Sequence, residues 1–141
     1  MRRGTTLPEL LLVCALLGLV AGFALPRVAD ALDGVRVTQA AHEVAGALTL
    51  ARAAAIRRAA FAAVILDERE GTVRVESLGD TLLHRALRAD HRVTLRATRD
   101  TLTYGPDGLG HGAANSTIVI ERRAHAETVT VSRLGRTRRS W

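Results

Sequence analysis

The chain has 141 residues, 48% of them hydrophobic, and a formal net charge of +6 at pH 7. Once the apolar N-terminal stretch ending at Pro26 is set aside, about 115 residues remain, which is room for one domain of ordinary size and not for two. The single cysteine, Cys14, excludes an intramolecular disulfide, so the domain must be held by packing and strand pairing.

The first element in the chain is an apolar stretch of nineteen residues, 7–25. As a helix it would be roughly 28 Å long, close to the hydrocarbon thickness of a bilayer. Arg2 and Arg3 precede it, and no further positive charge occurs before Arg27. Clustered arginines before a first span hold that end in the cytoplasm. We therefore expect a single-pass inner-membrane protein whose C-terminal part lies in the periplasm.

Glu9 stands at the entrance of this apolar stretch. An acid within a spanning helix costs on the order of 2.5–3.5 kcal/mol on insertion scales, so such a residue calls for a function and a partner. If the chain were cut after Gly4, the new amine of Thr5 would lie four residues before Glu9 on the same helix face. That amine, in the same or a neighbouring copy, is the natural partner of Glu9.

The basic leader ending in Gly4, the acid at Glu9 and the retained apolar helix resemble the N-terminus of type IV pilins and type II secretion pseudopilins. The resemblance implies that a prepilin peptidase removes residues 1–4 and N-methylates Thr5. It also implies that Glu9 guides assembly into a helical filament. The family usually has Phe where this chain has Thr5.

Three other interpretations of the same stretch remain open. A conventional secretory signal could be cleaved near residues 22–24, although Glu9 inside the apolar run argues against it. A lipoprotein signal would use Cys14, but Val13 is large where a small residue is expected. A plain membrane anchor, in which Glu9 only reaches toward the interface, is the third.

Beyond the span, the helix is expected to continue. Pro26 cannot donate a helical hydrogen bond and is expected to kink the helix. Asp30, Asp33 and Gly34 then predict a solvated, loosened turn. After it, apolar residues recur at steps of four and three and predict an amphipathic helix with an alanine-rich seam: Val37, Ala41, Val44, Leu48, Ala51 and Ala55.

One helix from Thr5 to about Arg58 would be roughly 80 Å long. We expect its membrane half at residues 5–26 and its periplasmic half at residues 27–59.

From Phe61 the pattern changes from helical to extended. Residues 61–66 and 72–76 predict a hairpin, residues 117–121 and 128–132 an antiparallel pair, and residues 91–96 and 101–104 two further strands. Residues 78–87 are ambiguous, and residues 109–115 predict a loop. About six strands after one long helix predict an α+β fold, with a small antiparallel β-sheet head at residues 60–141 packed on the outer half of the helix.

With the head included, the resemblance narrows to the GspH/FimT group of minor pseudopilins and pilins, through residues 102–108, the paired strands and the ending at residues 129–136. Members resembling GspH are low-abundance components of the type II secretion pseudopilus, near its tip. Members resembling FimT belong to type IV pili, and some bind DNA. The resemblance implies as partners the prepilin peptidase, other major and minor subunits, the inner-membrane assembly platform and secreted proteins.

The C-terminal end is basic, with six arginines and one acid over residues 122–141. All basic residues of the chain are arginine, which GC-rich coding explains. Four of them, near the flexible Gly135 and the stacking surface of Trp141, could neutralise phosphates without reading sequence: Arg133, Arg136, Arg138 and Arg139. Alternatively, they form a solvated tail or pair with acids of a neighbouring subunit.

An enzymatic function has little support. The five histidines are scattered, no His/Cys/Asp group has the spacing of a metal site, and no serine lies in a nucleophile-elbow context. We expect no catalytic residue, metal or cofactor. The sequence thus predicts a minor pseudopilin of type II secretion, with a DNA-binding minor pilin as the alternative and an anchored protein outside any filament as the third possibility.

Overall fold

The computed structural model describes residues 6–112 and 115–140. It contains two compact units, Met1–Leu32 and Asp33–Trp141, which are described separately. Helix α1 (Leu7–Arg58) begins in the first unit and ends in the second.

In the first unit, the described residues are those of α1 and its preceding Thr6, whose carbonyl accepts from the amide of Leu10 at 3.1 Å. Every large apolar side chain of this part of the helix is exposed. By length and composition, α1 is the one helix of the described residues that could cross a membrane. The helix passes through Pro26. The kink expected at this proline stays a prediction.

In the second unit, α1 buries one face made largely of alanine. All six residues of the predicted seam are buried, and so are Ala40, Ala47 and Ala54. Alanine and aliphatic side chains fill this face, which is how a chain with few aromatic residues closes its core. The helix ends where Ala59 adopts φ 48° and the amide of Ala60 bonds the carbonyl of Ala55 at 3.2 Å, an arrangement typical of helix C-termini.

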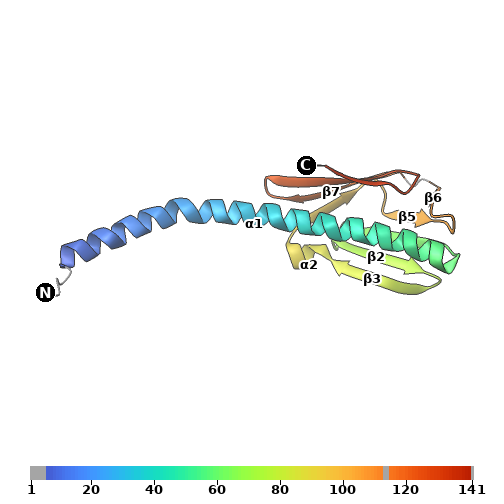
Figure 1. Cartoon of the computed structure of the whole chain (residues 1–141), viewed down its shortest axis with the longest axis horizontal. Helices are drawn as coiled ribbons and strands as arrows, with labels where there is room; N and C mark the ends of the chain where they lie inside the picture. Colours follow the sequence, from blue (N-terminus) through green and yellow to red (C-terminus); the bar gives the residue numbers. More distant parts are fainter. Residues whose placement is uncertain (1–5, 113–114, 141) are drawn as a thin grey trace. The chain divides into compact units, whose positions relative to one another are not determined.

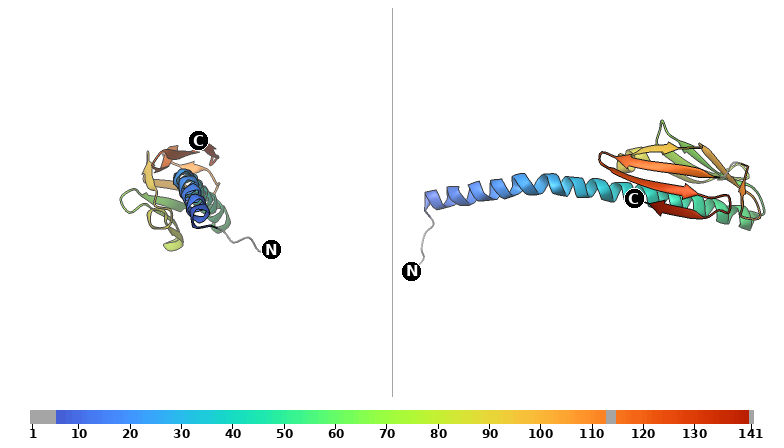
Figure 2. Two further views of the ribbon diagram at one scale, coloured as in Figure 1. Left: turned by 90° about the vertical axis from the view of Figure 1, so that its left-hand side faces the viewer. Right: turned by 90° about the horizontal axis from the view of Figure 1, so that it is seen from above.

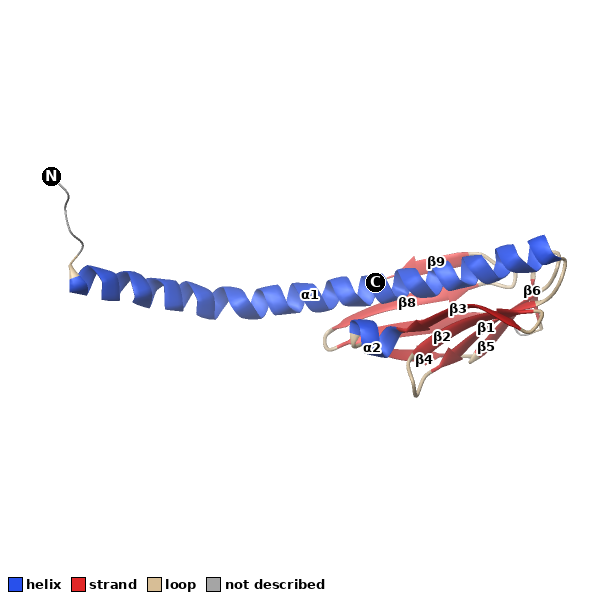
Figure 3. Cartoon of the chain, turned by 90° about the horizontal axis from the view of Figure 1, so that it is seen from below, coloured by secondary structure: helices blue, strands red, loops and turns tan. Residues whose placement is uncertain are grey.

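The strands form two antiparallel sheets that share this helix (Figures 1 and 3). The first sheet has the order β3-β2-β1-β5-β6, with bounds β1 (Ala62–Asp67), β2 (Thr72–Ser77), β3 (Asp80–Ala86), β5 (Thr101–Tyr104) and β6 (Gly110–His111). The second has the order β4-β7-β8-β9, with bounds β4 (Thr94–Ala97), β7 (Ser116–Arg122), β8 (His125–Val131) and β9 (Thr137–Ser140). A short helix, α2 (Leu87–His91), joins β3 to β4.

Strand register places one apolar face of each sheet in a common core. Val64 of β1 faces Val75 of β2, and Ile118 of β7 faces Val129 of β8; all four are fully buried. Tyr104 is the largest side chain of this core. Burial raises the pKa of its hydroxyl, and Arg52 opposes that shift. The predicted α+β class, a long N-terminal helix on antiparallel strands, and both predicted strand pairs are confirmed.

Three expectations about the head are corrected. The described residues form nine strands in two sheets, where about six were expected, because β3 forms in the ambiguous segment, the two-residue β6 in the expected loop and β9 at the C-terminal end. The basic C-terminus is not a tail, because β9 pairs with β8. Figure 2 draws this last segment, in dark red, as a strand of the head. The loosened turn is also wrong, since α1 runs through Asp30, Asp33 and Gly34 and Asp33 is only 2% exposed.

Candidate functional site

The N-terminal assembly residues lie at the beginning of α1. Gly4 and Thr5 lie outside the described residues, whereas Glu9 is in the first turn of the helix and exposed. Its Oε2 accepts a hydrogen bond from the backbone N–H of Thr6 at 3.4 Å. The N-terminus of a helix favours negative charge, because its first N–H groups lack helical partners. Glu9 therefore places a carboxylate at the start of an exposed apolar helix, where it is accessible to a cationic group of another molecule.

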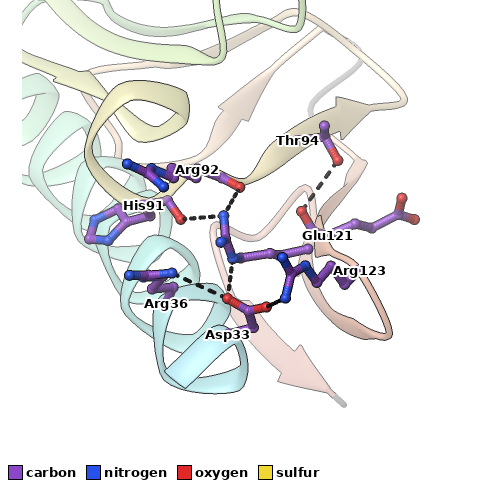
Figure 4. Close-up of polar contacts among 8 residues, drawn as sticks. Asp33, Arg36, His91, Arg92, Thr94, Glu121 and Arg123 are labelled. Carbon is purple, nitrogen blue, oxygen red and sulfur yellow. Dashed lines mark hydrogen bonds and ion pairs between the residues drawn. The ribbon is translucent and has the colours of Figure 1, made fainter. Parts of the chain in front are cut away.

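A buried carboxylate ties α1 to the rest of the second unit (Figure 4). Arg122 donates its Nε to Asp33, while Arg36 and Arg123 lie 3.2 and 3.1 Å from the same carboxylate. The hydrogen bond from Arg122 lowers the pKa of Asp33, burial opposes that shift, and the charges of all three arginines add to the lowering. Arg122 also donates to the carbonyl of Arg92 at 2.6 Å. One side chain thus joins the helix, the β7–β8 hairpin and the C-terminal end of α2.

A second buried acid holds the last strand against α1. Glu127 is 1% exposed, and its Oε1 accepts from the Nε of Arg139 at 2.6 Å. The same guanidinium lies 2.6 Å from Nδ1 of His42 on the helix. A guanidinium can only donate, so Nδ1 of His42 is the acceptor in this contact. Arg139 bridges β8, β9 and α1, and is occupied within its own chain.

The other three candidate arginines are exposed on the turn before β9 and on β9 itself. Arg133, Arg136 and Arg138 form no ion pair with any residue that the structure describes. Arg136 and Arg138 line a groove of about 790 Å³ together with Arg52 of α1, and none of its described lining residues is an acid. The site therefore presents three guanidinium groups around one hollow.

Two glycines set the shape of this groove. Arg52 donates its Nε to the carbonyl of Gly108 at 2.9 Å. Gly135 has φ 71°, and a Cβ placed on it would lie 3.1 Å from that same Nε. The amide of Gly110 donates to the carbonyl of Arg133 at 2.9 Å, which fixes the turn before β9 against β6. The two segments that carry the resemblance in the head thus meet at Arg52.

The two buried acids were missed by the sequence reasoning, although signals for them exist. Glu127 has the same parity in its strand as the buried Val129 and Val131. Asp33 lies four residues before Val37 and so shares its helix face. Among residues 6–112 and 115–140, no group of three His, Cys, Asp or Glu side chains could hold a metal ion.

Comparisons with known proteins agree on one superfamily. Residues 40–135 match the family model described as type II transport protein GspH. The pilin-like protein PilA1 of Thermus thermophilus is 48% identical over 60 residues, which are 43% of this chain and 37% of that protein. The match thus spans little more than a third of the length of this relative.

Two solved structures are similar in fold. The type IV minor pilin FimU of Pseudomonas aeruginosa gives a TM-score of 0.61 at 16% identity, covering 73% of this chain and 91% of FimU. The minor pseudopilin EpsH of the Vibrio cholerae type 2 secretion system gives 0.59 at 14% identity, covering 74% and 96%. At these identities the likeness concerns the fold alone, which is that of type IV pilins and pseudopilins.

Proposed function

The chain belongs to the GspH family, as a minor pilin or pseudopilin of the type IV pilin superfamily, and from this premise we propose that it is a minor subunit of a type II secretion pseudopilus. The observation that carries the proposal is the first part of α1, an apolar helix with all its large side chains exposed and Glu9 in its first turn. Such a helix suits both a bilayer and a bundle of like helices.

In this proposal, a prepilin peptidase cleaves after Gly4 and methylates the new amine of Thr5. That amine pairs with Glu9 of a neighbouring subunit and sets the register of the incoming chain. The position of Glu9 supports this role, because its carboxylate is exposed beside the helix start and, among the residues that the structure describes, its hydrogen bond is the 3.4 Å contact with Thr6. Pairing of the Glu9 carboxylate with the amine of Thr5 inside a filament offsets the free-energy cost of placing an acid in an apolar environment.

The location and the remaining partners follow from the same proposal. Residues 5–26 anchor the chain in the inner membrane before assembly, and the head lies in the periplasm. There it meets the assembly platform, other major and minor subunits, and secreted proteins. Its work is structural, and it needs neither a catalytic residue nor a cofactor.

The proposal is tested by changing Glu9 to Gln in the native host. This change removes the charge but keeps the size of the side chain. We expect the amount of the protein in sheared filaments to fall at least tenfold while its amount in membranes is unchanged. Glu9→Asp is the matched control and should retain most of the incorporation. Equal incorporation of Glu9→Gln and wild type would contradict the role of Glu9.

The groove around Arg52, Arg136 and Arg138 favours a second candidate, a minor pilin that binds DNA. Three guanidinium groups around a hollow without acids suit the phosphates of a nucleic acid, independent of its sequence. Changing Arg136 and Arg138 to Ala should weaken binding to duplexes of any sequence and reduce the salt slope of log K by about 1.8. The control is Arg96→Ala, an exposed arginine of β4 outside the groove. No salt-sensitive DNA binding by the full chain at low ionic strength would exclude this candidate.

A further inference from the structure

Exposed apolar side chains gather at one end of the head. Among the described residues of the second unit, six large apolar side chains are exposed, and five of them lie where α1 ends or in the turns beside it. These five, which we call the end patch, are Ile56, Phe61, Leu78, Leu109 and Leu134, with exposed fractions of 50, 53, 69, 42 and 60%. The sixth is Val35, near the other end of the unit's helix. A cluster of this kind is typical of an interaction site.

The end patch is continuous through contacts between its segments. The side chain of Ile56 packs on Gly108, because a Cβ added to this glycine would lie 2.7 Å from Cδ1 of Ile56. The ring of Phe61 meets that of His111 edge to face, with centroids 5.1 Å apart. The carbonyl of Phe61 accepts from the hydroxyl of Ser77, next to Leu78, at 3.1 Å.

The turn that carries Leu134 joins the same end, because the amide of Gly110 bonds the carbonyl of Arg133. Helix α1 ends at this side of the head, close to β5 and β6 (Figure 1). Four connections far apart in the sequence thus bring exposed apolar side chains to the same end of the head.

The rim of the end patch is basic. Arg57, Arg133 and Arg136 are exposed and form no ion pair with a described residue. Two acids lie near them, Asp80, which pairs with Arg58 at 3.0 Å, and Asp107, which accepts from the amide of Leu109 at 3.0 Å, so the arginines outnumber the acids at this rim. A partner that covers this surface must therefore bring its own carboxylates, because complementary charge favours encounter and like charge opposes it.

A second copy of this chain does not fit that requirement. Two copies meeting patch to patch would place arginines against arginines. The exposed acids of the β1–β2 turn, Asp67, Glu68 and Glu70, could face those arginines, but no large apolar side chain is exposed there to cover the patch. Neither of these head surfaces of a second copy fits, and the proposed function assigns the exposed apolar part of α1 to the bilayer and the filament, so the occupant is a different protein.

We propose that the end patch docks a different subunit of the same filament, through an apolar surface on that subunit rimmed by acidic side chains. The choice of a filament subunit rests on the proposed function, whereas the apolar and acidic chemistry rests on the patch itself. Leu134 and Phe61 form the apolar contact, and Arg133 and Arg136 pair with the partner's carboxylates.

The test uses the full chain in membranes of the native host, with photoreactive benzoylphenylalanine at position 61. Irradiation should give one adduct with another pilin-like subunit, joined through a peptide that contains apolar residues and Asp or Glu. Arg133→Glu combined with Arg136→Glu should reduce the adduct at least tenfold. The matched pair Arg96→Glu and Arg99→Glu, outside the patch, should leave it within twofold. Leu134→Ser should reduce the adduct, and Leu134→Met should preserve it.

Any of four results would overturn the inference: no adduct, an adduct with a second copy of this chain, an adduct with lipid or nucleic acid, or equal losses from both pairs of charge reversals. The proposed function fails separately. If Glu9→Gln incorporates normally but the adduct forms, only the proposed role of Glu9 is lost. If the protein enters filaments without forming the adduct, only the end patch loses its assignment.

Discussion

At the scale of single residues, buried acids on α1 and β8 decide which arginines stay available. Arg138 and Arg139 are neighbours on β9 with opposite surroundings. Arg138 is exposed on the groove, whereas Arg139 pairs with the buried Glu127. The strand alternation of β9 sorts the two, because adjacent side chains point to opposite faces of a sheet.

This sorting predicts different costs for two adjacent substitutions. Arg139→Ala leaves the Glu127 carboxylate buried without a partner and should lower the free energy of unfolding by about 3 kcal/mol. Arg138→Ala removes an exposed group and should change it by less than about 0.5 kcal/mol. Urea unfolding of the detergent-solubilised full chain, followed by protease resistance of the head, measures both. Similar urea midpoints for the two variants would show that the ion pair between Glu127 and Arg139 adds nothing to the free energy of unfolding.

Asp33 predicts a dependence of stability on pH. Its pKa in the folded protein is lowered below the ordinary 3.8, chiefly by the hydrogen bond from Arg122. The contribution of the ionised Asp33 to the free energy of unfolding is therefore fully present above pH 3.8, the ordinary pKa. It is lost as the pH falls through the lower pKa of Asp33 in the folded protein. Asp33→Asn should melt at a lower temperature than wild type at pH 7, and the difference should shrink as the medium is acidified into that range. A difference that stays constant with pH would contradict the ion cluster.

At the scale of elements, the alanine seam of α1 sets how closely the two sheets approach. Ala47 is fully buried against the sheets, whereas the preceding residue, Gly46, is exposed with open space at its Cβ position. Substitutions at these two adjacent positions therefore compare a buried and an exposed site on the same turn of the helix.

Ala47→Leu should overpack the seam and lower the free energy of unfolding by about 1–3 kcal/mol. Gly46→Ala should raise it by up to about 1 kcal/mol, because alanine is the better helix former. Thermal melts followed by circular dichroism measure both changes. A neutral Ala47→Leu would mean that the helix and the sheets are not closely packed at this point.

The sequence predicted elements well where a repeat was regular and poorly where polar residues were buried. The spacing of Val37, Ala41 and Val44 fixed the buried face of the helix, and alternation fixed the β1–β2 and β7–β8 pairs. Strand β9 was missed because its residues, Thr-Arg-Arg-Ser, read as a solvated tail. Its place depends on Glu127, and a long-range ion pair leaves no periodic signal in the sequence. The burial of Asp33 was missed for the same reason, because it pairs with Arg122, which is far away in the sequence.

At the scale of the whole molecule, two sets of residues carry the function that we propose. The first is the N-terminal set, Gly4, Thr5 and Glu9, which was predicted from sequence alone because it is a local motif, and which stays a prediction. The second is the arginine set on the head, whose members lie far from Arg52 in the sequence and meet it only in the fold. The groove and the end patch could therefore not be predicted, since each is built from turns that only the sheet topology brings together.

The central claim, that this chain is processed as a pilin-like subunit, is tested most directly by the intact mass of its N-terminal peptide from membranes of the native host. We expect the loss of Met1 to Gly4 and one added methyl group on Thr5. An uncut Met1, or a peptide that begins near residue 25, would contradict it and would make the chain an ordinary anchored or exported protein.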